Sequence, residues 1–293
     1  MDEQDRLAER FEAHRSHLRA VAYRLLGSLS EADDAVQETW LRLSRSDADR
    51  VENLPAWLHT VVSRLCLDML RSRSARREEP IERQPAQQVR DDGGGDPEGE
   101  AVLIDSVGRA LLVVLDTLAP AERIAFVLHD AFAVPFDQIA PVVERSPATA
   151  KKLASRARHK VRGTPAVSAD GLAAQRRVVD AFLAAARDGD LEGLLTVLAP
   201  DVVRRADRAA LPPGVPTTSR GARAVAEETR VLGRRARFAA PALVNGSVGV
   251  VVAPHGRLLL ALTFTVEDGR IAGYEVIANP VRLRGLELAV LDG

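Results

Sequence analysis

Two segments of the sequence are rich in basic side chains that could bind phosphate groups. Residues 64–77 contain five arginines, and residues 145–162 contain seven Lys and Arg residues and no carboxylate. Such side chains neutralise nucleic-acid phosphates and release the counterions around them. Residues 78–100, which separate the two segments, are acidic, so the net charge of -1 is the sum of blocks of opposite sign. This pattern indicates charged partners despite the near-neutral total.

The basic residues 145–162 form the end of a predicted helix-turn-helix at about 122–162. The pattern of residues 136–143 favours a short helix followed by a turn at Glu144-Arg145. Pro141 disfavours the middle of that helix, and it fits better within the first turn of a helix that starts near Gln138.

The second helix of this motif is expected to begin at Ser146-Pro147, with serine as the cap and proline as the first helical residue. One face is small and apolar and should pack on the first helix. The opposite face is polar and basic, which suits a helix that reads base edges and grips phosphates in the major groove. The alternative is a solvated basic helix on a structural bundle. The side chains of the candidate DNA-reading face are Arg145, Thr149, Lys151, Lys152, Ser155 and Arg156.

Residues 3 to about 77 are predicted to be almost entirely helical, because apolar residues recur at spacings of three and four. Gly27-Ser28 should end one helix, Ser30 should cap the next, and Asn53-Leu54-Pro55 should introduce a third. The single cysteine, Cys66, cannot form an internal disulfide and is interpreted as a core residue.

The helix that follows Ser30 carries a polar patch opposite an apolar stripe. This patch suits a basic protein surface, although such a face is most often simply solvated. Its members are Asp33, Asp34, Gln37 and Glu38. The later helix, residues 56–73, begins apolar and ends basic, as expected of a helix that packs at one end and meets phosphates at the other.

The C-terminal part of the sequence changes character. Helices are predicted at about 170–188, 190–198 and 221–232, followed by four strands near 238–244, 248–253, 258–266 and 270–278. Asp268-Gly269 joins the last two strands and is a strong hairpin signal. Helices followed by a meander indicate an α+β unit.

The order and spacing of these parts resemble the extracytoplasmic-function (ECF) group of bacterial sigma factors. Residues 34–42, Asp-Ala-Val-Gln-Glu-Thr-Trp-Leu-Arg, are similar to that family's polymerase-clamp-binding helix. Residues 56–73 are similar to its −10 promoter segment, and residues 117–158 to its −35-reading domain. The resemblance covers about 160 residues in the right order.

The resemblance implies a role for each matching residue. It implies contacts of Asp33, Asp34, Gln37 and Glu38 with the clamp of the β′ subunit of core RNA polymerase, and a further contact of the chain with the β flap. It implies −10 promoter contacts from Arg64, Asp68 and Arg71, and −35 readout from the six residues of the candidate DNA-reading face. The family often has Asn where this chain has Arg64, which puts the −10 base preference in doubt.

Residues 171–293 resemble the SnoaL-like (NTF2-like) domain that is fused to one branch of these factors. Asn279, Pro280, Arg282 and Leu283 match that branch's C-terminal Asn-Pro-Asp-Lys-Leu element, which we take as a regulatory motif. The branch's Asp-Gly-Gly-Gly element has no equivalent at 201–207, so regulation is expected to differ here.

The predicted architecture is therefore multidomain: two all-α sigma domains, a helical bundle and a helix-turn-helix, followed by an α+β SnoaL/NTF2-like cone. We expect two separately folded helical modules joined by a flexible linker. The predicted parts are the region 2 domain 1–77, the linker 78–100, the region 4 domain 101–163 and the SnoaL-like domain 164–293.

Catalytic patterns are absent from the sequence: we find no paired carboxylates, metal-ligand cluster, nucleophile elbow or phosphate loop. We therefore expect no enzyme activity, no cofactor and no metal. The expected function is promoter-directed transcription initiation with the C-terminal domain regulating it in cis. The alternative is a DNA-binding regulator whose cone senses a small ligand. No membrane span is predicted, and the chain is expected to be cytoplasmic and monomeric when free.

Overall fold

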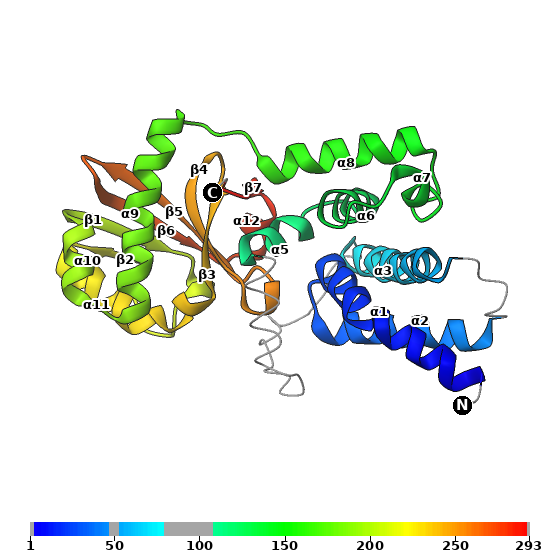
Figure 1. The fold of residues 1–293 in the computed structure, drawn as a ribbon. Helices are drawn as coiled ribbons and strands as arrows, with labels where there is room; N and C mark the ends of the chain where they lie inside the picture. Colours follow the sequence, from blue (N-terminus) through cyan, green and yellow to red (C-terminus); the bar gives the residue numbers. More distant parts are fainter. Residues whose placement is uncertain (1–2, 47–52, 79–107, 292–293) are drawn as a thin grey trace. The chain divides into compact units, whose positions relative to one another are not determined.

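The computed structural model describes residues 3–46, 53–78 and 108–291, which form two compact units. Unit 1 takes its described residues from the stretches up to 78 and from 118–158, and unit 2 takes residues 108–117 and 159–291. Figure 1 shows helices in unit 1, and helices with a sheet in unit 2. The predicted linker 78–100 lies almost wholly outside the described residues, so it stays a prediction, as do the domain boundaries.

Three long helices form the first part of unit 1, as the periodicity predicts. They are α1 (Glu3–Leu26), α2 (Leu29–Arg45) and α3 (Leu54–Glu78). The cap of α2 differs from the prediction: Ser28, not Ser30, is the N-cap, and its side chain accepts a bond from the Glu31 amide. Gly27 takes a positive φ of 72° between α1 and α2, and α2 begins two residues earlier than predicted.

The helix-turn-helix follows the predicted order with one correction. Its elements are α6 (Pro120–Phe126), η2 (Val127–Ala131), α7 (Phe136–Ile139) and α8 (Pro147–Arg162). The helix predicted at 136–143 ends at Ile139, and Pro141 lies in the turn. Proline at that place removes an amide donor, so the helix stops before it.

Unit 1 joins the two predicted helical modules, which corrects the expectation of separate folding. Helix α3 contacts α6 and α7, and α1 contacts η2. Cys66 is buried within α3, and burial raises the pKa of its thiol to about 12, as expected of a core residue. Lys152 and Arg156 stay exposed at the surface of the unit.

Unit 2 is an α+β unit in which helices lie against a mixed sheet (Figure 1). Its helical elements are α5 (Arg109–Asp116), α9 (Ala169–Asp188), α10 (Leu191–Val197), η3 (Arg208–Ala210), α11 (Ala222–Leu232), η4 (Gly233–Phe238), η5 (Pro254–Gly256) and α12 (Pro280–Arg284). Its strands are β1 (Leu198–Ala206), β2 (Thr218–Arg220), β3 (Ala239–Val244), β4 (Ser247–Val252), β5 (Leu260–Glu267), β6 (Arg270–Ile277) and β7 (Leu288–Ala289).

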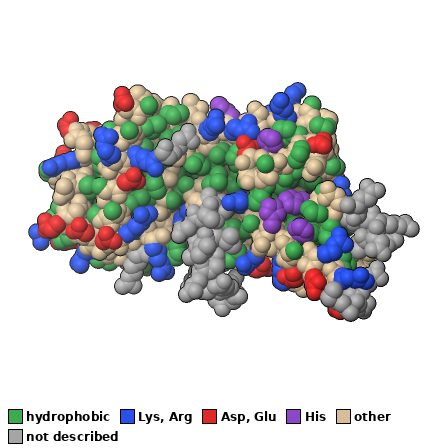
Figure 2. All heavy atoms as spheres, in the orientation of Figure 1, with side chains coloured by type: hydrophobic (Ala, Val, Ile, Leu, Met, Phe, Trp, Pro, Cys, Tyr) green, Lys and Arg blue, Asp and Glu red, His purple; other side chains and the backbone are tan. Residues whose placement is uncertain are grey.

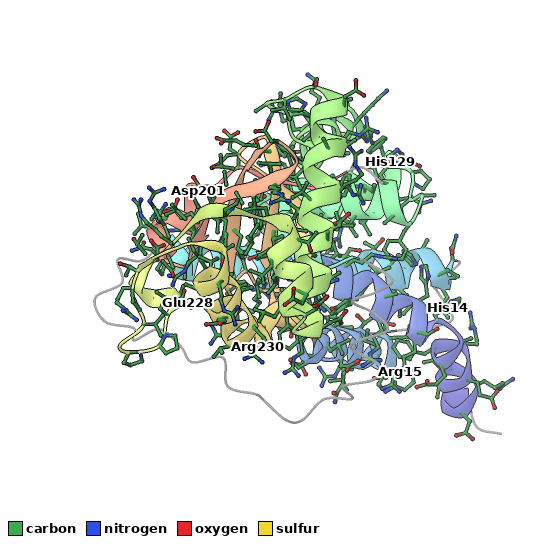
Figure 3. All side chains as sticks on the ribbon, turned by 90° about the vertical axis from the view of Figure 1, so that its left-hand side faces the viewer. His14, Arg15, His129, Asp201, Glu228 and Arg230 are labelled. Atoms are coloured by element: carbon green, nitrogen blue, oxygen red, sulfur yellow. The ribbon has the colours of Figure 1, made fainter. Side chains whose placement is uncertain are left out.

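The strands follow the order β2-β1-β6-β5-β4-β3-β7. The four predicted strands are present as the antiparallel meander β3 to β6, and Asp268-Gly269 joins β5 to β6 with positive φ at both residues. Strand β1 pairs in parallel with β6, and β1, β2 and β7 were not predicted. Asp201 is an exposed residue of β1 (Figure 3).

The core of unit 2 lies between α9 and the sheet. Phe182 and Leu183 of α9 are both buried, and they pack into clusters with residues of the strands. Phe182 lies 5.5 Å from Tyr274 of β6, measured between ring centroids. This packing fixes α9 on one face of the sheet. No helix in the described ranges is long and apolar enough to cross a membrane.

Candidate functional site

The acidic patch of α2 lies on the exposed side of that helix, opposite its buried stripe. Asp33 is already engaged within unit 1, because Arg19 of α1 donates to both of its carboxylate oxygens at 2.6 and 3.1 Å. Such a paired arrangement ties α2 to α1. Asp33 therefore stabilises the helix pair, and only a part of its carboxylate remains for a partner.

Asp34, Gln37 and Glu38 complete the acidic patch. Asp34 and Gln37 are exposed, whereas Glu38 accepts a 3.0 Å bond from Arg42 one turn later in the same helix. An exposed pair of this kind contributes little to stability, typically less than about 1 kcal/mol. It can therefore open at low cost when a basic surface approaches.

The three predicted −10 residues share one face of α3, because 64, 68 and 71 are spaced by four and three residues. Arg64, Asp68 and Arg71 are all exposed. Arg71 lies 3.9 Å from Asp68 in a weak pair within the helix. The structure therefore brings these residues together as the sequence predicts.

The same face of α3 contacts the turn of the helix-turn-helix. Arg64 donates to the backbone oxygen of Pro141 at 3.1 Å, and Arg71 pairs with the carboxylate of Glu144 at 3.3 Å. Glu144 has a positive φ of 56°, which directs the turn between α7 and α8. Two arginines that could meet DNA phosphates are thus held by this turn, a feature that the sequence alone does not reveal.

Helix α8 presents the predicted DNA-reading face to solvent. Its apolar face is buried, with Ala150, Ala154 and Ala157 fully so, and it packs within the unit. The exposed or half-exposed side chains are those predicted: Arg145, Thr149, Lys151, Lys152, Ser155 and Arg156. The side chains of this face that carry charge are all cationic, which suits the phosphates of a duplex.

The start of α8 is fixed by its cap. The Ser146 hydroxyl accepts a bond from the Thr149 amide at 3.3 Å, as the sequence predicts, and Pro147 is the first helical residue. Arg158, farther along, pairs with Asp130 at 2.7 Å. Arg158 is therefore used to hold α8 against η2.

Histidine side chains gather on one face of unit 1 (Figure 2). The rings of His17 and His59 lie 4.7 Å apart, and His17 also contacts Phe132 edge-on at 5.3 Å. Burial is the main cause that lowers the pKa of His17, and the nearby charges of His14 and Arg24 lower it further. Burial is also the main cause that lowers the pKa of His59. The neutral rings are favoured where α1, α3 and the segment after η2 pack together.

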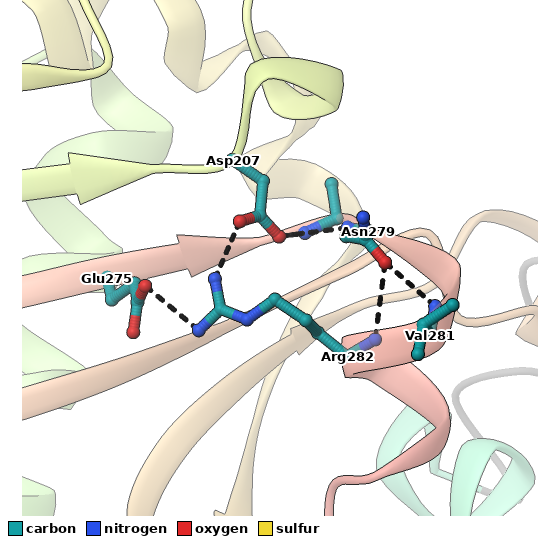
Figure 4. A network of polar contacts seen from close by, with 6 residues as sticks. Asp207, Glu275, Asn279, Val281 and Arg282 are labelled. Carbon is teal, nitrogen blue, oxygen red and sulfur yellow. Dashed lines mark hydrogen bonds and ion pairs between the residues drawn. The ribbon is translucent and has the colours of Figure 1, made fainter.

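The predicted regulatory motif of unit 2 begins helix α12. The Asn279 side chain caps this helix by accepting bonds from the amides of Val281 and Arg282, and Pro280 is its first residue. Arg282 then bridges two carboxylates, at 2.6 Å from Asp207 and 2.9 Å from Glu275 (Figure 4). Leu283 lies in the same short helix and is partly buried.

Asp207 is the residue of this network that sequence reasoning missed. It directly follows β1 and accepts bonds from the amides of Ala278 and Asn279 at 3.0 and 2.9 Å. Burial alone would raise the pKa of Asp207, but these amides and Arg282 outweigh it and lower the pKa. No local pattern marks Asp207, because its partners lie 71 to 75 residues later.

The described residues contain no group of His, Cys, Asp and Glu that could hold a metal ion. The polar groups of the site are arranged for binding surfaces: an acidic face on α2 and cationic faces on α3 and α8. These faces can form ion pairs with a basic protein and with a polyanion.

Comparison with known proteins bears directly on these faces. The model of Sigma-70 region 2 matches residues 10–76, which contain the acidic face of α2 and the predicted −10 residues of α3. The model of Sigma-70, region 4 matches residues 108–161, which contain α8. Together the two models match more than a third of the chain.

The chain is also similar to curated relatives over most of its length. It is 40% identical over 301 aligned positions, covering 95% of this chain and 93% of the relative, to the ECF RNA polymerase sigma factor SigJ of Mycobacterium tuberculosis. It is 38% identical to the probable ECF RNA polymerase sigma factor SigI of the same species, covering 71% of this chain and 72% of that protein.

Among solved structures, the crystal structure of M. tuberculosis SigJ covers 95% of this chain and 98% of its own, at 34% identity and a TM-score of 0.44. The expected order of helical sigma regions followed by an α+β unit is confirmed. With both sigma-70 regions in order and 40% identity over nearly its whole length, the chain belongs to the ECF sigma factors of bacterial RNA polymerase.

Proposed function

We propose that the acidic face of α2 binds core RNA polymerase, through the clamp of its β′ subunit. Asp34 and Gln37 are exposed, and the Glu38 pair with Arg42 is weak enough to open. A carboxylate-rich helix face complements a basic protein surface and sets the orientation of docking. Asp33, held by Arg19, fixes the angle of α2 in this proposal. The helix-turn-helix binds the β flap of the same enzyme.

Promoter DNA is the second proposed partner, and α8 is proposed to read the −35 element. Its exposed cationic face, with Lys152 and Arg156 at its centre, supports phosphate contacts beside base readout. The face of α3 that carries Arg64 and Arg71 is proposed to contact the −10 element. Its bonds to Pro141 and Glu144 would then be exchanged for bonds to DNA.

Unit 2 is proposed to regulate the sigma domains within the same chain. A tethered unit acts at an effective concentration of about millimolar, so it needs no separate regulatory protein. The network of Asp207, Asn279 and Arg282 supports this proposal, because it gives the C-terminal motif a defined, charged surface. The factor acts where its polymerase is, in the cytoplasm.

The polymerase contact is tested by changing three residues of the acidic face together. The variant D34A/Q37A/E38A should bind core RNA polymerase at least roughly tenfold more weakly than the wild type, since charged interface groups typically contribute 1–3 kcal/mol each. Binding is measured by fluorescence anisotropy of labelled full-length chain titrated with core polymerase.

The matched control is E9A/E12A/S16A, which also removes two carboxylates and one neutral polar group, from exposed positions of α1. This control should bind polymerase like the wild type. Equal binding by both triple variants would remove the α2 face from the interface.

A further inference from the structure

Unit 2 contains a cavity of about 440 Å³ between its helices and its sheet. Protein interiors normally leave few voids larger than a water molecule, whereas ligand pockets fall between about 300 and 1,000 Å³. The space exists because the wall is built from small residues. Five alanines line it: Ala186, Ala209, Ala210, Ala236 and Ala239.

The rest of the wall is mainly apolar. Phe182 of α9 and the aliphatic side chains Val250, Leu260 and Leu262 of β4 and β5 face the cavity. Val231, which also lines it, is 65% exposed and is one of the two large hydrophobic side chains so exposed among the described residues. The lining of the cavity therefore reaches the surface of unit 2 at Val231.

A polar corner interrupts this lining. Arg204 of β1, whose side chain is 3% exposed, forms an ion pair with Glu228 of α11 and donates to the backbone oxygen of Pro216 at 3.0 Å. Glu228 and its neighbour Arg230 can be followed on α11 in Figure 3. The ion pair neutralises the corner, so a further full charge there would be desolvated without a counter-ion.

Tyr274 supplies the acceptor of this corner. The Thr229 hydroxyl donates to the backbone oxygen of Val225 at 2.7 Å, so the 2.8 Å bond between Thr229 and Tyr274 must have the tyrosine as donor. The lone pairs of the Tyr274 oxygen then remain for another donor. Burial raises the pKa of Tyr274 to about 12, so the phenol stays protonated at neutral pH.

We propose that this cavity binds a neutral, largely apolar ring compound that carries a hydroxyl group at one end. Its rings fill the space left by the alanines. Its hydroxyl donates to the Tyr274 oxygen and accepts from Arg204, which has five N–H donors and uses two of them on Pro216 and Glu228. The inference goes beyond the sigma-factor function, which does not require a ligand.

The test uses the full-length chain without polymerase or DNA and three two-ring probes in isothermal titration calorimetry. The probes are 2-naphthol, 2-methylnaphthalene and 2-naphthoate, which differ only in a hydroxyl, a methyl and a carboxylate group. We expect 2-naphthol to bind about three- to tenfold more tightly than 2-methylnaphthalene, as one hydrogen bond provides. The charged 2-naphthoate should bind most weakly.

Two variants locate the binding site. Y274F should weaken the binding of 2-naphthol and leave that of 2-methylnaphthalene unchanged, because it removes one of the two hydrogen bonds of the hydroxyl, whereas A210W should abolish binding of both by filling the space. Y23F, the same change in unit 1, and A224W, on an exposed position of α11 away from the cavity, are the matched controls. Circular dichroism checks folding, and A209W replaces A210W if that variant unfolds.

The proposal is overturned if none of the probes binds, if 2-naphthoate or 2-methylnaphthalene binds as tightly as 2-naphthol, or if Y274F or the filling variants bind 2-naphthol like the wild type. Each of these results would leave the sigma-factor assignment untouched, because polymerase and promoter are absent from the assay.

Discussion

Asp207 shows how one residue can organise a motif far away in the chain. Its carboxylate accepts two backbone amides at the end of β6 and pairs with Arg282 of α12. The family resemblance directs attention to Asn279 and Arg282, but their common partner becomes visible only in three dimensions. Sequence patterns are local, and this contact is set by the parallel pairing of β1 with β6.

The variant D207N should lower the free energy of unfolding of the full chain by about 1–3 kcal/mol, because charge-assisted bonds to Arg282 and to two amides are weakened. The lowered pKa means that the folded state favours the ionised form, so this stability is present above the ordinary value of 3.8 and is lost as pH falls through the folded pKa. Urea unfolding at pH 7 and at acidic pH measures both effects.

The control for this variant is D201N, which changes an exposed carboxylate of the same strand. D201N should unfold like the wild type. The role assigned to Asp207 would be contradicted if D207N lowered the free energy of unfolding no more than D201N does. It would also be contradicted if the loss of unfolding free energy in D207N grew as the pH falls.

At the scale of elements, helices were more predictable than strands. The long helices of unit 1 and α9 to α11 follow apolar spacings that the sequence displays directly. Strand β1 was missed because it follows α10 without a break and carries Pro200, Asp201 and two arginines among its nine residues. Its burial is imposed by pairing with β6, which is a tertiary effect.

The contact of α3 with the turn before α8 is the element-scale feature with most consequence for function. Charge at residue 144 should control how often the two elements separate. The variant E144Q removes the ion pair with Arg71 and should raise the population of the separated form about two- to fivefold, in line with an exposed pair of up to about 1 kcal/mol.

This separation is measured by single-molecule energy transfer between dyes at S44C and A148C, which lie on α2 and α8. The native Cys66 is buried with a raised pKa, so it does not compete for labelling. D137N, at an exposed position of α7, is the charge-matched control and should leave the distribution unchanged. Identical distributions for E144Q and the wild type would mean that the pair does not hold the elements together.

At the scale of the whole molecule, sequence reasoning identified the order of the sigma regions and the α+β unit that follows them. It did not predict that helices of both sigma regions form one compact unit. Two basic segments separated by an acidic stretch instead indicated two independent modules. The structure instead brings the rings of His17 and Phe132, one from each region, into edge-on contact. The faces assigned to polymerase and promoter nevertheless remain exposed.

The central claim, that this chain directs bacterial RNA polymerase to promoters through these faces, is tested most directly by transcription from a library of genomic fragments with core polymerase and the purified full-length chain. Sequencing of the RNA 5′ ends should reveal discrete start sites preceded by shared −10 and −35 elements. These starts should be absent with core polymerase alone and with K152A/R156A, which should still bind polymerase. The account would be contradicted if the wild-type chain gave no more start sites than core polymerase alone. It would also be contradicted if K152A/R156A gave the same start sites as the wild type.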